Sequence, residues 1–199
     1  MRIVEAKRRR GKLYDVVCED GDTVLMDARV FEEHGLAEGS VLSEQAWEAL
    51  LAESLYRRAR EKALWLLSVK ERSKAELREK LREEAPANVA EETADEMERL
   101  GLLDDERYAV RLAEELRCVR HFSRRHTEQE LRRRGIDRAV SEQASWGVDT
   151  TDEEQALALL HKKRYNKDCD EKTRRRMADL LARHGYDYDT IRHALAAFE

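Results

Sequence analysis

A short leucine pattern recurs at fifty-residue intervals along this chain. In each case a leucine is followed four residues later by a small residue: Leu81 by Ala85, Leu131 by Gly135, and Leu181 by Gly185. A period of this size is typical of tandem helical units, which bury a continuous core by stacking on their neighbours. The sequence therefore predicts a mostly α-helical fold, built from tandem three-helix repeats in an elongated array.

The repeats can be placed from their helical stripes of apolar residues. We assign three repeats in chain order, to residues 43–101, 102–149 and 150–199. Their first helices carry Ala63, Ala109 and Ala156, which are 46 and 47 residues apart, so the loop between first and second helix must vary in length. With 41% charged residues, 6% aromatic residues and a single proline, the composition also favours helices.

Polar residues mark where the helices begin. Ser73 and Glu76 form a capping-box pattern, in which the serine caps the helix and the glutamate reaches back to it. Asp104 and Asp105 open the first helix of repeat two, where a carboxylate caps the chain and favours the helix dipole. The second helix of this repeat, at about 123–134, has Leu131 as its only large apolar residue. Most of its surface is therefore expected to face solvent or a partner.

Residues 1–42 are predicted to form a small β-rich N-terminal module. β-Branched and aromatic residues indicate an antiparallel sheet, with strands at 2–6, 13–18 and 23–26 and turns at 8–11 and 20–21. Such a sheet is too small to be stable alone and must pack on helices. A short helix over 28–33 follows. A long helix that Ser43 caps then runs to about Val69 and ties the sheet to the repeats.

Charge is strongly segregated along the chain, although the net charge is only -5. Residues 15–54 carry eleven acidic residues against one basic residue, Arg29. Residues 117–134 carry seven basic against two acidic, and residues 162–176 carry eight against three. This distribution suits a mixed partner such as a protein–nucleic acid complex. It argues against a polycation that simply coats DNA.

Two arginine clusters are the candidate binding residues. They lie on the second helices of repeats two and three and comprise Arg124, Arg125, Arg132, Arg133 and Arg134 in the first, and Arg174, Arg175 and Arg176 in the second. Arginine pairs bidentately with carboxylate or phosphate, so the clusters fit either an acidic protein surface or DNA. The alternative interpretation is that both are ordinary solvated helix faces.

Several stretches resemble the motifs of one family, the RecX family of regulatory proteins of the RecA recombinase. The stretch from Gly101 to Ala109, Gly-Leu-Leu-Asp-Asp-Glu-Arg-Tyr-Ala, is similar to the family signature. Three further motifs are similar to the family's repeats and lie at 73–81, 130–136 and 183–195. Two departures are Ala85-Pro86, where the family has glycine and an aromatic residue, and His126-Thr127, where a larger apolar residue is expected. The second departure predicts a loosely anchored helix.

The resemblance implies a non-enzymatic modulator of RecA, more specifically an inhibitor. Such a protein would bind along the RecA–DNA filament and restrain ATP hydrolysis, strand exchange and coprotease activity, and so act in DNA recombination, DNA repair and the SOS response. The alternative is a helical repeat protein that binds single- or double-stranded DNA independently of RecA. A scaffold for some other partner is a third hypothesis.

The sequence offers no pattern for catalysis, a metal or a cofactor. The Asp104–Asp105 pair is explained by capping, and no histidine pair or cysteine pair has the spacing of a zinc site. Nucleotide-binding glycine motifs are absent. The three cysteines, Cys18, Cys118 and Cys169, suggest free thiols in a reducing compartment. Without an apolar run of about 20 residues, we expect a soluble, cytoplasmic monomer with no membrane partner.

Overall fold

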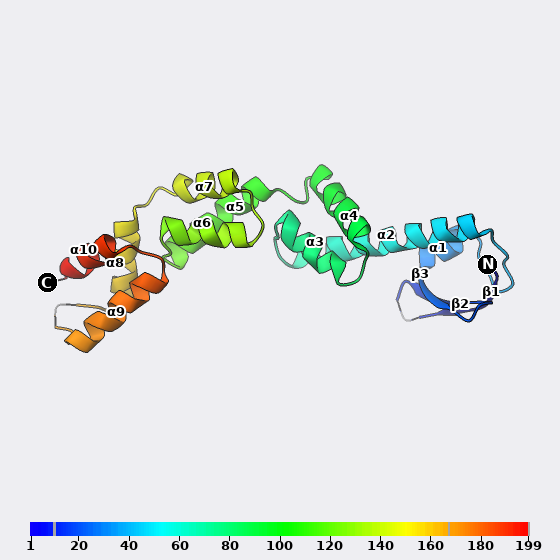
Figure 1. Cartoon of the computed structure of the whole chain (residues 1–199), viewed down its shortest axis with the longest axis horizontal. Helices are drawn as coiled ribbons and strands as arrows, with labels where there is room; N and C mark the ends of the chain where they lie inside the picture. The colour runs from blue at the N-terminus through cyan, green and yellow to red at the C-terminus, as the bar shows by residue number, and fades with distance from the viewer. Residues whose placement is uncertain (10, 167, 199) are drawn as a thin grey trace. The chain divides into compact units, whose positions relative to one another are not determined.

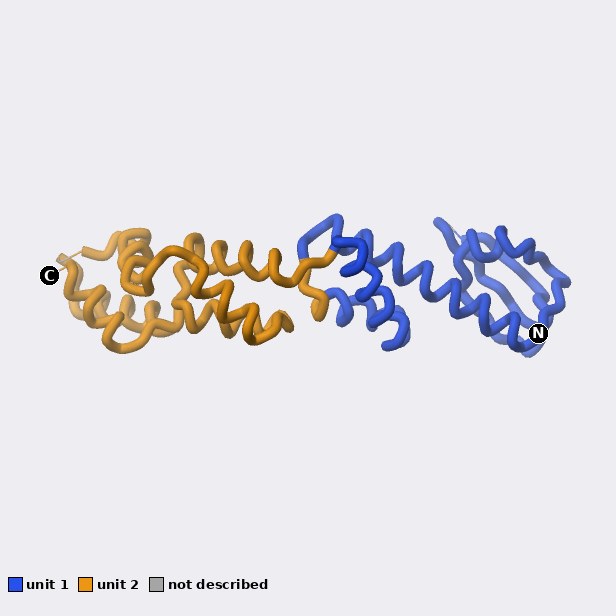
Figure 2. The backbone as a smooth tube through the Cα atoms, turned by 90° about the horizontal axis from the view of Figure 1, so that it is seen from above, with its two compact units in different colours: residues 1–71, 77–102 blue, residues 72–76, 103–199 orange. Residues whose placement is uncertain are grey.

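A computed structural model describes residues 1–9, 11–166 and 168–198 and is mostly helical, with a three-stranded antiparallel sheet at the N-terminus (Figure 1). This is the predicted fold class. The chain forms two compact units, coloured separately in Figure 2. Unit 1 comprises residues 1–71 and 77–102, and unit 2 comprises residues 72–76 and 103–199.

The sheet of unit 1 has the order β1-β2-β3, with β1 at Ile3–Arg8, β2 at Leu13–Cys18 and β3 at Thr23–Asp27. Both neighbouring pairs are antiparallel. Arg8, which the sequence analysis placed in a turn, instead ends β1 and pairs with Tyr14. Its guanidinium lies 5.9 Å from the centre of the Tyr14 ring, a cation–π contact that favours the longer strand. Arg10 of the same predicted turn lies outside the described residues.

Two helices cover the sheet. Helix α1 spans Ala28–Glu33, and α2 spans Glu44–Val69 with the Ser43 hydroxyl accepting from the Ala46 N–H, as predicted. The sheet and these helices share one apolar core, made of Ile3, Val16, Cys18, Met26, Val30, Phe31, Leu36, Trp47 and Leu50. The helical cover that so small a sheet requires is therefore provided by α1 and the first half of α2.

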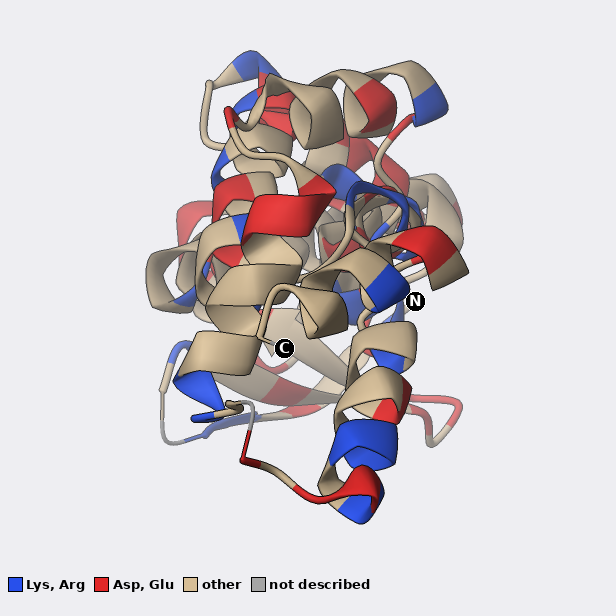
Figure 3. Ribbon diagram, turned by 90° about the vertical axis from the view of Figure 1, so that its left-hand side faces the viewer, with Lys and Arg blue, Asp and Glu red and all other residues tan. Residues whose placement is uncertain are grey.

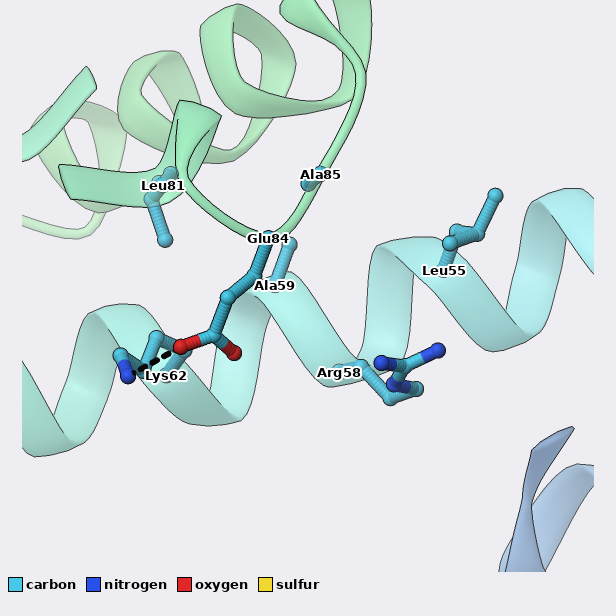
Figure 4. A pocket seen from close by; sticks show the side chains of 7 residues that line it. All are labelled: Leu55, Arg58, Ala59, Lys62, Leu81, Glu84 and Ala85. Atoms are coloured by element: carbon cyan, nitrogen blue, oxygen red, sulfur yellow. Dashed lines mark hydrogen bonds and ion pairs between the residues drawn. The ribbon is translucent and has the colours of Figure 1, made fainter. Parts of the chain in front are cut away.

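The second half of α2 packs on α4, which spans Ala87–Arg99, while α3 spans Lys74–Arg82. The Tyr56 hydroxyl and the Arg60 guanidinium of α2 both bond the Glu96 carboxylate of α4, at 2.8 and 3.0 Å. Figure 4 shows a small hollow lined partly by residues of α2, where Lys62 and Glu84 form an ion pair of 2.5 Å. Leu55, Ala59, Leu81 and Ala85 line the same hollow.

Unit 2 contains the remaining helices. They are α5 at Asp105–Glu114, α6 at Arg124–Arg133, α7 at Arg138–Gly147, α8 at Asp152–Lys162, α9 at Glu171–Arg183 and α10 at Tyr188–Ala196. A π-helical turn, η1 at Glu115–Val119, continues α5. One core joins α5, α6 and α7, and a second joins α8, α9 and α10.

The predicted caps are present. The Ser73 hydroxyl accepts from the Glu76 N–H at 3.0 Å, and the Glu76 carboxylate accepts from the Ser73 N–H at 3.1 Å, which completes the capping box. Asp104 caps α5 by accepting from the Arg107 N–H at 2.8 Å. Repeat three has a second capping box, between Thr151 and Glu154, that the sequence analysis did not identify.

The second helices α3 and α6 begin with a similar contact. In each case the hydroxyl of the capping serine donates a hydrogen bond to a carbonyl at the end of another second helix. The Ser73 hydroxyl donates to the Arg134 carbonyl at 2.5 Å. Fifty residues later, the Ser123 hydroxyl donates to the Gly185 carbonyl at 2.8 Å. Each serine thus ties the first turn of one second helix to the residues that end the next one.

At each of these two serine contacts, a glycine allows the two chain segments to pack closely. A Cβ on Gly135 would lie 2.2 Å from the Ala75 Cβ, and a Cβ on Gly185 would lie 2.6 Å from Ser123 Oγ and the His126 Cβ. Both glycines also have positive φ, +80° and +87°, which favours glycine at the end of a helix. The recurring small residue in the sequence is therefore explained at these two positions by close packing and backbone conformation together.

We predict that Gly135→Ala destabilises the protein more than Gly101→Ala. Both glycines have positive φ, so each substitution costs about 1–2 kcal/mol of backbone strain. Only Gly135 adds a steric clash, worth a further ~1–3 kcal/mol, because nothing lies within 4 Å of the Gly101 position. Urea denaturation of the two variants measures the difference. Equal losses of unfolding free energy would contradict the packing role of Gly135.

Candidate partner-binding helices

Helix α6 has a buried face and an exposed face, and its arginines are divided between them. Thr127 and Leu131 are fully buried, four residues apart. Arg124 and Arg134 lie three residues before and after this pair, so they share its side of the helix. Arg125, Arg132 and Arg133 lie on the opposite side and are exposed. Helical phase, rather than the run of charge, decides which arginines face solvent.

Arg134 belongs to a polar network inside unit 2. Its guanidinium donates to the Tyr108 hydroxyl at 2.8 Å and lies 3.3 Å from the Glu76 carboxylate, and the Tyr108 hydroxyl in turn donates to Glu76 at 3.1 Å. Burial alone would lower the pKa of Arg134, but the neighbouring Tyr108, Glu76 and Glu130 raise it. The Arg134 side chain is only 19% exposed, so it joins α6 to residues 76 and 108.

Arg124 is likewise held by its own chain. Its backbone N–H donates to Asp152 Oδ1 at 3.0 Å, and its guanidinium donates to the Thr150 carbonyl at 2.8 Å. The guanidinium also lies 4.5 Å from the centre of the Trp146 ring, a cation–π contact. Helix α6 is therefore anchored more firmly than its single leucine suggested. The additional contacts are those of Thr127, Arg124 and Arg134.

Helix α9 repeats this arrangement. Leu181 is fully buried, and Arg174 lies seven residues before it, as Arg124 does before Leu131. Arg174 is half-buried and engaged within the chain, whereas Arg175 and Arg176 are exposed. We use the term outer arginines for the exposed members of both clusters, which are Arg125, Arg132, Arg133, Arg175 and Arg176.

Three of the outer arginines form ion pairs with carboxylates of their own helix. Arg133 lies 2.8 Å from Glu130, Arg132 lies 3.7 Å from Glu128, and Arg175 lies 3.0 Å from Glu171. Pairs at the protein surface contribute little to stability, typically about 0–1 kcal/mol. The Glu130 side chain is only 15% exposed, so its pair with Arg133 is better shielded from solvent than the other two. Figure 3 shows basic and acidic segments alternating along the helices. Arg132 and Arg175 can therefore exchange their local carboxylates for those of a partner, or for phosphates, at small cost.

A buried arginine that the sequence analysis did not single out supports the start of α6. Arg117 of η1 is fully buried, and its guanidinium donates to the Phe122 carbonyl at 3.0 Å and to the Thr150 carbonyl at 2.7 Å. It also forms an ion pair with Asp152. The available signal was its phase, because Arg117 follows Ala113 by four residues on the buried side of α5.

Three histidines, His121, His126 and His184, lie near the start of α6. The Phe122 ring lies 4.3 Å from the His126 ring and 5.2 Å from the His184 ring. His121 Nδ1 lies 2.8 Å from the Gln155 side-chain oxygen. Burial lowers the pKa of His184, although its hydrogen bond to the Leu180 carbonyl acts in the opposite direction, and the charges of His126 and His121 lower it further. The net effect is that the pKa of His184 lies below its ordinary value.

Neither a metal centre nor a membrane segment is evident in the part of the chain that the structure describes. No group of three or more histidine, cysteine or acidic side chains there could hold a metal ion. None of the described helices combines the length and apolarity that a bilayer crossing requires. The helical repeats and the outer arginines are therefore the candidate functional features of the described residues.

These features define a class of protein, a tandem three-helix repeat protein with arginine-bearing second helices. Three family models match the chain: the first three-helix domain of RecX at residues 59–97, the second at 104–144 and the third at 151–195. Together the matches cover more than half of the chain. The chain therefore belongs to the RecX family.

Relatives and solved structures agree with this assignment. A "Regulatory protein RecX" from Amycolatopsis mediterranei is 36% identical over 138 residues, covering 67% of this chain and 79% of its own. One from Clostridioides difficile is 25% identical, covering 96% and 92%. A crystal structure of regulatory protein RecX matches with a TM-score of 0.62 at 20% identity, covering 95% and 96%. At that identity the structural match supports the fold alone.

We predict that Arg117→Met lowers the unfolding free energy by roughly 2–4 kcal/mol, because the Phe122 and Thr150 carbonyls lose their Arg117 donor and Asp152 loses its fully buried ion-pair partner. Arg120→Met, four residues before Arg124, is the matched control. Arg120 is exposed and bonds Glu115 at 2.7 Å, so its loss is expected to cost under ~1 kcal/mol. Urea denaturation measures both. Similar losses of unfolding free energy in the two variants would contradict the stabilising role assigned to the buried Arg117.

The lowered pKa of His184 predicts a loss of stability in mild acid. The unfolded chain binds a proton at His184 near the ordinary histidine pKa, about 6.5, whereas the folded chain binds it only at lower pH. This contribution to stability is complete above pH 6.5 and declines as the pH falls through that value toward the folded-state pKa. His184→Gln should flatten the pH dependence of unfolding free energy below pH 6.5 and leave it unchanged above pH 7.5. An unaltered slope in the acid range would contradict the assignment.

Proposed function

We propose that this chain is a non-enzymatic modulator of the RecA recombinase, acting as an inhibitor. The observation that carries the proposal is membership of a family whose curated relatives are named regulatory proteins. In this proposal the chain binds along the RecA–DNA filament. Contact with successive RecA subunits restrains ATP hydrolysis, strand exchange and coprotease activity.

Tandem repeats suit this role because linked weak contacts add to a tight one. Helices α6 and α9 each present outer arginines whose side chains are exposed. A guanidinium can bind a carboxylate of the recombinase or a phosphate of its DNA in the same bidentate geometry. Arg124, Arg134 and Arg174 lie on the buried sides of these helices and would instead hold them in place.

A second candidate is nucleic-acid binding without RecA. It is favoured by Trp146, which is 62% exposed beside Arg124, because exposed aromatic rings next to arginines can stack on bases. The acidic N-terminal half argues against it, since residues 15–54 would repel phosphates. The two candidates differ in whether RecA is needed for tight binding.

The proposal is tested by adding the protein to RecA, single-stranded DNA and ATP at less than one molecule per RecA subunit. We expect slower ATP hydrolysis and strand exchange, because one chain contacts several subunits. Unchanged rates with the matched recombinase would refute the proposal. Gel shifts with DNA alone, across a range of salt concentrations, measure the second candidate directly.

We predict that Arg132→Ala/Arg133→Ala raises the concentration needed for half-inhibition about tenfold or more, because two charged contacts are lost. Neither side chain lies on the buried side of α6, so helix content and unfolding free energy should stay close to the wild type. Arg138→Ala/Arg192→Ala is the matched control, since it removes the same charge from exposed positions on α7 and α10. Equal inhibition by both double variants would contradict the role of the outer arginines.

A further inference from the structure

A groove runs along α5 and η1 on one side and α7 on the other. It consists of two open hollows, of about 480 and 610 Å³, that share Glu114, Gly147 and Val148 and are therefore continuous. It extends from Asp104 to Val119 along α5 and η1. At about 1.5 Å per residue this is roughly 20 Å, or about four turns of a helix. All of it lies within unit 2.

The groove is acidic. Five carboxylates line it, those of Asp104, Glu106, Glu114, Glu115 and Asp149. Its basic residues are Arg107 and Arg111. Glu115 is paired with Arg120 at 2.7 Å, but Glu106, Glu114 and Asp149 have no side-chain partner among the described residues. The groove therefore has a net negative charge that the chain itself does not neutralise.

The groove also has an apolar lining. Val110 and Val119 are 49% and 59% exposed. Val140 and Ala144 of α7 line the same hollow as Val110, and Val119 lines the other hollow. Exposed aliphatic side chains between unpaired carboxylates are typical of the surface that receives an amphipathic helix. The π-helical turn contributes to this surface, because η1 turns Arg117 inward and leaves Cys118 and Val119 in the groove. Such turns are frequent at functional sites.

We propose that this groove binds a basic amphipathic helix of a partner protein. The aliphatic side chains of that helix would lie against Val110 and Val119, and its lysines or arginines would pair with Glu106, Glu114 and Asp149. A nucleic acid does not fit, because its phosphates would be repelled by the same carboxylates. This goes beyond the proposed function, since it assigns a second surface, opposite in charge to the outer arginines, and does not depend on RecA.

The test uses the full chain and a fluorescent 15-residue amphipathic helical peptide made of leucine, alanine and lysine. Binding is measured by anisotropy, and the contact is mapped by amide chemical shifts. We expect saturable binding, with shifts concentrated in residues 104–119 and 140–149. Glu114→Lys should weaken it at least tenfold. Gly147→Phe should also block it, because nothing lies within 4 Å of a Cβ at this helical position and the ring can occupy the groove without strain.

Glu142→Lys is the matched control, since it reverses an exposed charge on α7 outside the groove, and it should change affinity by less than twofold. Thermal melts confirm that each variant is folded. The proposal is overturned if the peptide does not bind, if Glu114→Lys and Glu142→Lys behave alike, or if an acidic analogue binds equally. Competition by an oligothymidine would point instead to nucleic acid. Sedimentation as a dimer that Glu114→Lys dissociates would point to a second copy of this chain.

Discussion

The buried guanidinium of Arg117 is the interaction on which the arrangement of α6 depends. Removing a charge from water is costly unless donors and acceptors are matched. Here Arg117 is matched by the Phe122 and Thr150 carbonyls and by Asp152. Thr150 and Asp152 are also the acceptors for Arg124 at the start of α6. One polar cluster therefore fixes the end of η1, the first turn of α6 and the start of α8.

The same construction appears at the start of α3. The Lys74 N–H donates to Asp105 at 2.8 Å, as the Arg124 N–H donates to Asp152. The two donors are fifty residues apart and the two acceptors forty-seven, which reproduces the two periods in the sequence. Each first helix thus supplies, from its first turn, a carboxylate that caps a second helix. This explains why the aspartates of the repeat are structural.

The parts of this structure that depend on local chemistry could be predicted from the sequence. Ser43, Ser73 and Asp104 are caps as expected, because capping needs only the residue and the helix that follows. The division of the arginines into a buried-side group and an exposed group could also be predicted from their spacing relative to Leu131 and Leu181. It was missed because the arginines are consecutive in the sequence and were treated as one charged cluster. The phase of Arg117 after Ala113 indicated its buried side, but its partners could not be predicted, because they require Thr150 and Asp152 to return to η1. The groove could not be predicted either, because it requires α7 to lie along α5.

We propose that the outer arginines contact the RecA filament while Arg117 supports α6 from inside. Arginine-specific modification with phenylglyoxal, read residue by residue in a mass spectrometer, tests it most directly. In the free protein the outer arginines should react and Arg117 should not. On a filament assembled on single-stranded DNA with a non-hydrolysable ATP analogue, Arg132, Arg133 and Arg175 should become protected while Arg138 and Arg192 keep their reactivity. Unchanged reactivity of the outer arginines, or equal protection by the DNA alone, would contradict the account.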